Sequence, residues 1–330
     1  APLGNGTFGL FVDATNTTVG GTANGAGNVI ANNGSDGVAV VNASLGNGIL
    51  RNTVYSNGGL GIDLGDDNVT LNNGTKNGAL PNSEMDFPVF TSAVLSETAL
   101  TVAGYVGSAP SQATFAGARV EIFKSSIDVS GNGEGQAYLD FLTTDGSGNF
   151  SGALTVSGLA VGDRITATAT DGSNSTSEFA LNILVAPIVT LGNGTDPANT
   201  SLAPGGAATM ADAFTFQAAS GTDTITAMTV TLAAGTSGGL SLMEITNDAG
   251  TVVYGSASNP ASDTPAITLT TNITATTTST QYKVRVTPKS HVSMPAAAGS
   301  TYSVTAFISA WTNAGGQAGS DSGGTTVTID

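Results

Sequence analysis

The chain has 330 residues, of which 10% are charged, and its 24 acidic residues against 8 basic ones give a net charge of −16. This balance leaves no basic face for a nucleic-acid partner and disfavours an anionic membrane surface. The absence of cysteine excludes disulfides, thiolate zinc sites and cysteine nucleophiles. No apolar run approaches the ~18 residues of a membrane span, so we expect no membrane insertion.

Residues 1–88 repeat a pattern in which a glycine is followed by alternating apolar residues. The pattern starts at Gly9, Gly37 and Gly61, so its spacings are 28 and 24 residues. A period in the twenties with Asn and Gly corners is typical of a solenoid in which each repeat forms one turn. Asn side chains at such corners can stack in hydrogen-bonded ladders between turns. The sequence therefore predicts a short parallel β-helix over residues 1–88.

Motifs in this region resemble the right-handed parallel β-helix repeats of large bacterial surface proteins. The resemblance is carried by Asn16–Gly21, Gly27–Ile30 and Asn57–Gly65, and Asp86–Val89 is similar to the segment that leaves the helix in that family. It extends to about residue 180 through motifs such as Ile165–Asp171. It implies a right-handed helix on a secreted protein of the bacterial cell surface. The chain begins partway through what looks like a turn, so we expect an open N-terminal end.

Residues 89–185 change to the alternation of antiparallel strands. Ile165, Ala167 and Ala169 alternate with polar residues, and clusters such as Asp145–Asn149 mark turns. Strands at this spacing predict an Ig-like β-sandwich with half-buried strands. After a boundary near Ala186, about eight further alternating segments predict a second sandwich over residues 186–330. The predicted fold class is therefore all-β: a short parallel β-helix followed by two antiparallel β-sandwich domains.

The sequence contains few residues that could support catalysis. His291 is the only histidine, so a serine triad or a histidine metal site has no base or ligand set to draw on. Asp63, Asp66 and Asp67 form an acidic cluster with Arg51 one partial turn earlier, which is the kind of group that polysaccharide-active β-helix enzymes use. About three turns are too short for a cleft that spans several sugars, and a solvated turn explains the cluster as well. We expect no enzyme activity and no required cofactor.

Calcium is a more plausible ligand than a substrate, since Ca²⁺ takes oxygens from Asp, Asn and Glu in Gly-rich loops. Ordinary turn chemistry is the alternative explanation for each loop. The candidate ligands lie in two loops, and they are Asp128, Asn132 and Glu134 in the first and Asp145 and Asn149 in the second.

Eleven Asn-x-Ser/Thr sequons permit glycosylation without showing it. The candidates that we single out are Asn5, Asn16, Asn33, Asn42, Asn193 and Asn199.

The sequence is best interpreted as an extracellular structural subunit of a microbial filament, sheath or surface layer. An uncapped solenoid exposes strand edges that template association, so we expect copies to assemble head-to-tail, with the C-terminal strand Thr325–Asp330 as a docking partner. The residues expected at the contact are Leu3, Phe8, Leu10 and Val12 at one end and Val327 and Ile329 at the other. The alternatives are an adhesin or module that binds surface glycans and, third, a polysaccharide-active enzyme.

Overall fold

A computed structural model describes residues 3–126, 129–295 and 299–330 of the chain. It confirms the all-β class, with 47% of the residues in strands and 4% in short 3-10 helices. The chain forms two compact units, residues 1–185 and 186–330. None of the helices in the described ranges has the length and apolar character needed to cross a membrane. The helices are η1 (Pro81–Glu84), η2 (Ala113–Phe115), η3 (Ser237–Gly239) and η4 (His291–Ser293).

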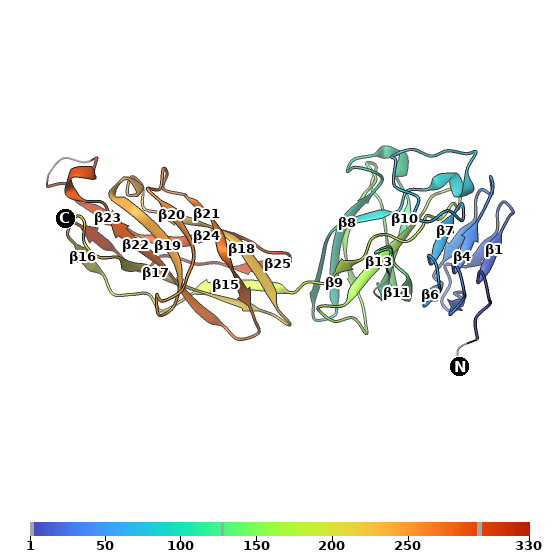
Figure 1. Ribbon diagram of the computed structural model, residues 1–330, viewed down its shortest axis with the longest axis horizontal. Helices are drawn as coiled ribbons and strands as arrows, with labels where there is room; N and C mark the ends of the chain where they lie inside the picture. The colour runs from blue at the N-terminus through green and yellow to red at the C-terminus, as the bar shows by residue number, and fades with distance from the viewer. Residues whose placement is uncertain (1–2, 127–128, 296–298) are drawn as a thin grey trace. The chain divides into compact units, whose positions relative to one another are not determined.

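The first unit begins with short strands that stack in parallel, coil upon coil (Figure 1). Leu10 pairs with Val38 and Val38 with Ile62, so consecutive coils are offset by the predicted 28 and 24 residues. The first coil contains β1 (Leu10–Val12), β2 (Thr18–Gly20) and β3 (Val29–Ala31), the second β4 (Val38–Val40), β5 (Gly48–Leu50) and β6 (Thr53–Tyr55), and the third β7 (Ile62–Leu64). The pairs β1–β4–β7, β2–β5 and β3–β6 form three small parallel sheets.

The repeated glycines occupy equivalent positions in these coils, as predicted. Gly9 donates its N–H to Asp36 O and Gly37 donates to Leu60 O, each over 2.9 Å. A Cβ atom at Gly37 would lie 2.6 Å from the carbonyl oxygen of Gly61, so the coils can approach this closely only without a side chain here.

Asparagine ladders join the corners of successive coils, as predicted. The Nδ2 of Asn28 donates to Oδ1 of Asn52 over 3.0 Å, and the Nδ2 of Asn33 donates to Oδ1 of Asn57 over 2.7 Å. Asn33 is buried, and its amide nitrogen is engaged in this ladder. Burial and this hydrogen bond leave little room for a glycan at Asn33, and its glycosylation stays a prediction.

The rest of the first unit consists of two antiparallel sheets around a shared apolar core. Residues from both sheets, such as Leu100 and Ile122, are completely buried in it. One sheet has the order β12-β9-β8 and the other β11-β10-β13-β14. Their bounds are β8 (Pro88–Ser96), β9 (Ala99–Val106), β10 (Arg119–Ser125), β11 (Gly135–Thr143), β12 (Asn149–Thr155), β13 (Arg164–Thr170) and β14 (Ile183–Leu184).

Strands β10 and β13 are buried on both faces, which the sequence did not indicate. Ile165, Ala167 and Ala169 of β13 face the shared core as predicted, yet the intervening Thr166 and Thr168 are also buried. The same alternation sends Phe123 of β10 into the core of the stacked coils. The expectation of half-buried strands is therefore wrong here, because the second face of this sheet packs against the coils.

The second unit contains a nine-stranded sheet and a three-stranded sheet around one core, in the orders β24-β18-β21-β20-β19-β22-β17-β15-β25 and β16-β26-β23. The bounds are β15 (Ile188–Asn193), β16 (Thr200–Leu202), β17 (Thr209–Ala218), β18 (Asp223–Leu232), β19 (Leu240–Asn247), β20 (Val253–Ser258), β21 (Ala266–Ala275), β22 (Thr280–Pro288), β23 (Tyr302–Val304), β24 (Ala306–Thr312), β25 (Gly316–Gly319) and β26 (Val327–Ile329).

The C-terminal strand is an internal strand of this second unit. β26 pairs in parallel with β16 and antiparallel with β23, and Val327 and Ile329 are buried in the core. Both of its edges are therefore occupied. The expectation that this strand docks onto another copy is wrong, because the strand pairs within its own unit.

Candidate functional site

The side of the stacked coils that meets the antiparallel sheets has several of its backbone N–H groups bonded to acidic or hydroxyl side chains. Glu121, Glu134, Thr176 and Glu178 accept these bonds, and we call the four residues the capping face. The hydrogen bonds run from Arg51 N to Glu121 Oε2 (2.6 Å), from Asn57 N to Glu134 Oε1 (3.1 Å), from Ile49 N to Thr176 Oγ1 (2.9 Å) and from Leu64 N to Glu178 Oε1 (3.0 Å). A parallel edge that would otherwise leave buried donors unpaired is thus sealed by side chains.

Alternation along β10 explains how a glutamate reaches this position. Val120 and Ile122 point into the core between the antiparallel sheets, so Glu121 points to the opposite face, toward the coils. The residue is completely buried there. A buried carboxylate is costly unless it is paired and hydrogen-bonded, and Glu121 is both.

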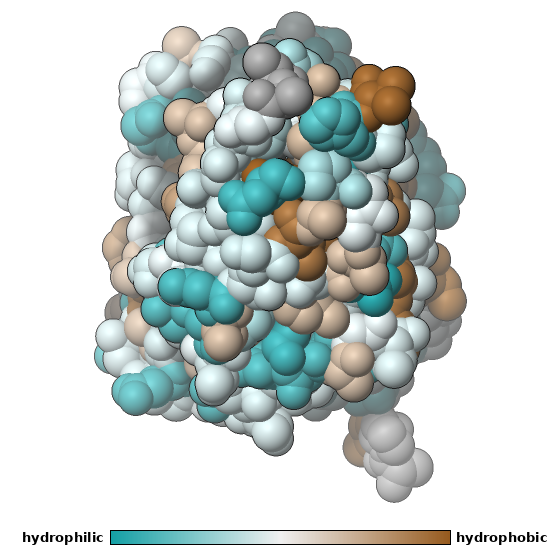
Figure 2. Space-filling view, turned by 90° about the vertical axis from the view of Figure 1, so that its left-hand side faces the viewer, coloured by the Kyte–Doolittle hydropathy of each residue, from teal (hydrophilic) through white to brown (hydrophobic). Residues whose placement is uncertain are grey.

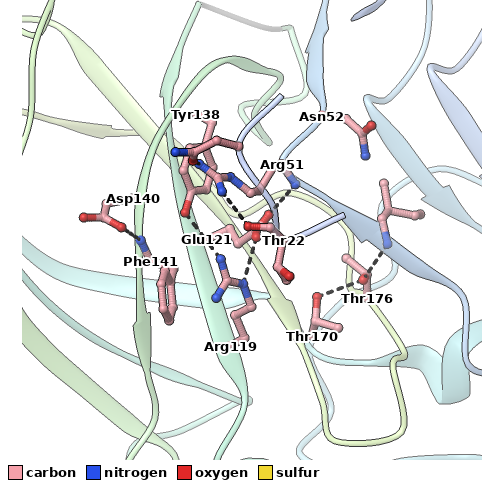
Figure 3. Close-up of polar contacts among 12 residues, drawn as sticks. Thr22, Arg51, Asn52, Arg119, Glu121, Tyr138, Asp140, Phe141, Thr170 and Thr176 are labelled. Carbon is pink, nitrogen blue, oxygen red and sulfur yellow. Dashed lines mark hydrogen bonds and ion pairs between the residues drawn. The ribbon is translucent and has the colours of Figure 1, made fainter. Parts of the chain in front are cut away.

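Two arginines surround Glu121 at this junction (Figure 3). Nε of Arg119 lies 2.8 Å from Oε1 of Glu121, and the guanidinium of Arg119 lies 3.5 Å from the ring centre of Phe141. The guanidinium of Arg51 lies 4.3 Å from the ring centre of Tyr138. The charge of the carboxylate is therefore matched by an ion pair, while both arginines stack on aromatic rings.

Arg51 also joins the first coil to the second. Its guanidinium donates to the carbonyl oxygen of Thr22 and to Oδ1 of Asn24. Its backbone is in the left-handed region, with φ of 53°, where its N–H points at Glu121. The hydrogen bonds of Arg51 thus go to the coils and the capping face, which is a structural role. Grouping it with the Asp63 cluster as sugar-active machinery receives no support from these contacts.

Glu178 is a second buried carboxylate of the capping face. Its two oxygens accept the N–H groups of Leu64 and Thr70, each over 3.0 Å. Burial, with a smaller contribution from the nearby charge of Asp63, raises the pKa of Glu178 to about 8, although its hydrogen-bond donors at Leu64 and Thr70 act to lower it.

Asp63 belongs to a group of acidic residues on the third coil. Burial raises the pKa of Asp63 to about 6, although the N–H groups of Asn68 and Asp67 bond to its oxygens. Carboxylate oxygens of Asp36, Asp63 and Asp66 lie within 4.8 Å of one another, a spacing at which they could hold a cation. The structure thus brings Asp36 to the predicted cluster of Asp63 and Asp66, while Asp67 contributes a backbone donor.

The predicted calcium loops have other partners. Asp128 lies outside the described residues. Nδ2 of Asn132 donates to the carbonyl oxygen of Phe179, and Glu134 belongs to the capping face.

In the second of these loops, Oδ1 of Asp145 accepts the N–H groups of Ser147 and Asn149, and Oδ1 of Asn149 accepts the N–H of Ser111. These contacts are those of turns. Calcium binding in either loop stays a prediction.

The five other glycosylation candidates singled out above lie on the surface, and their glycosylation stays a prediction. They are Asn5, Asn16, Asn42, Asn193 and Asn199.

The opposite side of the stack is open in the described chain. β1, β2 and β3 pair only with the second coil, so each has one unpaired edge. Phe11 is 55% and Val29 70% exposed there, and the predicted contact residues Leu3 and Leu10 are exposed as well. We call this surface the open edge.

Two of the predicted contact residues sit deeper than Leu3 and Leu10. Phe8 is half-buried, and its ring lies 5.5 Å from that of Phe11. The side chain of Val12 is buried in the core of the coils, and its place in a docking contact stays a prediction.

Sequence reasoning missed Glu121 and Glu178 as site residues. The available signal was a glutamate between two apolar residues of a strand, at Val120-Glu121-Ile122. No known protein-family model matches the chain.

Replacing Glu121 by glutamine should destabilise the first unit by about 2–3 kcal/mol. Glutamine keeps the size of the side chain but presents an NH₂ group to one of the two donors, Arg51 N or Arg119 Nε. Urea unfolding followed by far-ultraviolet circular dichroism measures the loss.

The matched control is Glu97→Gln on the surface, which should change the free energy of unfolding by less than about 0.5 kcal/mol. Trp311, the only tryptophan, lies in the second unit. The urea midpoint that its fluorescence reports should therefore be the same in Glu121→Gln as in the wild type. If the first unit of Glu121→Gln unfolded at the same urea concentration as that of the wild type, the capping role would be contradicted.

The raised pKa of Glu178 predicts that the first unit loses stability as the pH rises. The folded unit holds the proton more tightly than the unfolded chain, so this contribution is complete below the ordinary pKa of 4.5 and is lost as the pH rises through about 8. The free energy of unfolding of residues 1–185 should therefore fall from about pH 4.5 to about pH 8, the window set by the two pKa values.

In Glu178→Gln the free energy of unfolding should fall less steeply above about pH 6. The raised pKa of Asp63 also makes the unit lose stability with rising pH, but that loss is complete near the pKa of Asp63, about 6. Hydrogen exchange of peptides from residues 1–185 during urea unfolding separates this unit from the other. Equal slopes in the wild type and Glu178→Gln would show that Glu178 does not titrate in this range.

Proposed function

We propose that the protein is a non-enzymatic, extracellular structural subunit that assembles with copies of itself in a microbial filament, sheath or surface layer. In this proposal residues 1–88 form a short right-handed parallel β-helix, and residues 89–185 and 186–330 form two β-sandwiches of Ig-like type. The observation that carries the proposal is the difference between the two sides of the coils: one sealed by the capping face, the other open.

The open edge has the chemistry of a strand-addition site. Leu10 donates its N–H to Gly37 and Val12 accepts from Val41, so the N–H and C=O of Phe11, between them, face away from the second coil. Unpaired backbone groups beside exposed apolar side chains favour pairing with another chain. A coil or strand that docked here would extend the parallel sheets by one layer.

The surface that receives the open edge in the next copy is proposed to be a strand edge of the second unit. β16 pairs only with β26, and β25 pairs only with β15, among the residues that the structure describes. Figure 2 shows the end of this unit that carries β16 and β23, where brown hydrophobic residues are few and separated by pale and teal ones. Backbone pairing therefore supports docking there better than an apolar patch does. Such head-to-tail contacts generate filaments when they do not close into a ring.

Charge placed on the open edge should block assembly. Val29→Lys adds a charge at a residue that is 70% exposed on β3, and lysine on an edge strand disfavours pairing. Self-association should weaken by about tenfold or more, which corresponds to about 1.4 kcal/mol. Sedimentation velocity over a range of concentrations, with negative-stain imaging, measures it.

Leu71→Lys is the matched control, since Leu71 is 77% exposed in the same unit but lies outside β1, β2 and β3. It should assemble like the wild type. A wild-type chain that stays monomeric at every concentration would refute the proposal and favour the alternative of an adhesin or glycan-binding module. Sugar release that depends on Asp63 would favour the enzyme.

A further inference from the structure

Two acidic side chains from distant parts of the second unit meet in its interior. Asp212 of β17 is completely buried, and Asp321, in the segment between β25 and β26, is 8% exposed. Their carboxyl groups lie within hydrogen-bonding reach of each other. Apart from this contact, both oxygens of Asp212 and Oδ1 of Asp321 have no hydrogen-bond partner among the described residues. Each side chain thus depends on the other.

A hydrogen bond between two carboxyl groups needs a proton, because two carboxylates offer only acceptors and repel each other. Oδ2 of Asp321 accepts the N–H of Ile308 in β24 over 2.7 Å, which stabilises Asp321 as an anion. Asp212 has no such donor, so Asp212 carries the proton and donates the hydrogen bond. Burial, with the charges of Asp321 and Asp196, raises the pKa of Asp212 to about 9. Burial also raises the pKa of Asp321, although its hydrogen bonds from Ile308 and Asp212 act to lower it.

No basic side chain forms an ion pair with either acid in the described chain. β22, the strand paired with β17, carries two basic residues, but Lys283 pairs with Asp248 and Arg285 with Glu244. The other strands around the site, β15, β16, β23, β24 and β26, contain no charged residue. The third charge that acts on the pair is Asp196, in the segment between β15 and β16, and it is acidic as well. A second negative charge on the pair would thus meet no basic partner.

The acid pair attaches the segment that leads into β26. Asp321 lies at the start of this segment, and β26 at its end lies between β16 and β23 with Val327 and Ile329 buried. On the surface, Nδ2 of Asn193 donates to Oγ of Ser322 over 2.8 Å, where water competes for both groups. In the interior, the acid pair joins the segment to β17. Loss of the proton would turn this inner attachment into a repulsion between two buried charges.

We propose that the hydrogen bond between Asp212 and Asp321 is a proton-dependent latch, which holds the segment from Asp321 to β26 onto the rest of the second unit and releases it in alkaline solution. Opening would free the edges of β16 and β23 that β26 covers, and unpaired strand edges pair readily with other chains. The inference stands whether or not the protein assembles as proposed above.

The sign of the effect follows from the raised pKa of Asp212. The closed segment holds the proton more tightly than the open one, because opening returns Asp212 to water and toward its ordinary pKa of 3.8. This contribution is complete below pH 3.8 and is lost as the pH rises through about 9. Between about pH 6 and pH 8 the opening equilibrium of the segment should therefore rise about tenfold per pH unit.

The test measures this opening by thiol labelling. The chain has no cysteine, so Val327→Cys provides a single thiol, at a completely buried position in β26. Its labelling rate, divided by the rate in the urea-unfolded chain at the same pH, gives the opening equilibrium. From about pH 6 to pH 8 this equilibrium should rise about a hundredfold. When Asp212→Asn is added, it should change by less than about threefold, because the amide of asparagine donates to Asp321 without titrating.

Two controls separate the latch from general stability. Asp223 is a buried carboxylate of the same unit, but Thr224, Asn313 and Gly315 donate to it, so Asp223→Asn should keep the hundredfold rise. Ile245→Cys, at a completely buried position in β19, reports the unfolding of the larger sheet. Its thiol should be labelled at least about tenfold more slowly than that of Val327→Cys, because the segment opens while the sheet stays folded.

Three results would overturn the proposal. The opening equilibrium at Val327→Cys might not change with pH, or its rise might survive in Asp212→Asn, and either result would show that the pair does not hold the segment. Equal labelling rates at Val327→Cys and Ile245→Cys would show that the unit opens only as a whole. All three measurements use dilute monomeric protein, so none depends on whether the protein assembles.

Discussion

The structure of the first unit depends on how a stack of parallel strands satisfies the backbone groups at its two sides. Each inner coil is saturated by its neighbours, but a terminal coil presents donors and acceptors that must find partners or face water. On one side, Glu121, Glu134, Thr176 and Glu178 supply these partners from the antiparallel sheet. On the other side, β1, β2 and β3 keep an unpaired edge in the described chain. The proposed function follows from this asymmetry.

Sealing a sheet edge with carboxylates has consequences for packing and charge. The sheet that carries Glu121 must bury both faces, so threonines such as Thr168 fill the side toward the coils and alanines the side toward the core. The buried Glu178 holds its proton to a pKa of about 8 because desolvation outweighs its N–H donors. Coils and antiparallel sheets therefore form one compact unit, since separating them would expose N–H groups and leave buried acids without donors.

Much of the local structure could be predicted from the sequence, because it follows from the regular spacing of residues that are close together in the chain. The spacing of Gly9, Gly37 and Gly61 and the corner asparagines indicated the stacking register, and alternation indicated the antiparallel strands. Contacts between distant segments left no such signal. Asn33 looks like an ordinary sequon until its ladder partner Asn57 is known, and the C-terminal strand looks free until β16 and β23 flank it. Asp212 and Asp321, 109 residues apart, meet only through the fold of the second unit.

Amide hydrogen exchange at single-residue resolution, on dilute monomeric protein, tests the asymmetry of the coils most directly. The account predicts that the amides of Arg51 and Leu64 exchange slowly, since Glu121 and Glu178 accept their hydrogen bonds inside the unit. The amide of Phe11, in the middle of β1, should exchange orders of magnitude faster, and should slow when the protein associates. Equal exchange at Phe11 and Leu64 in the monomer would contradict the account, because the two sides would then not differ in how their backbone groups are satisfied.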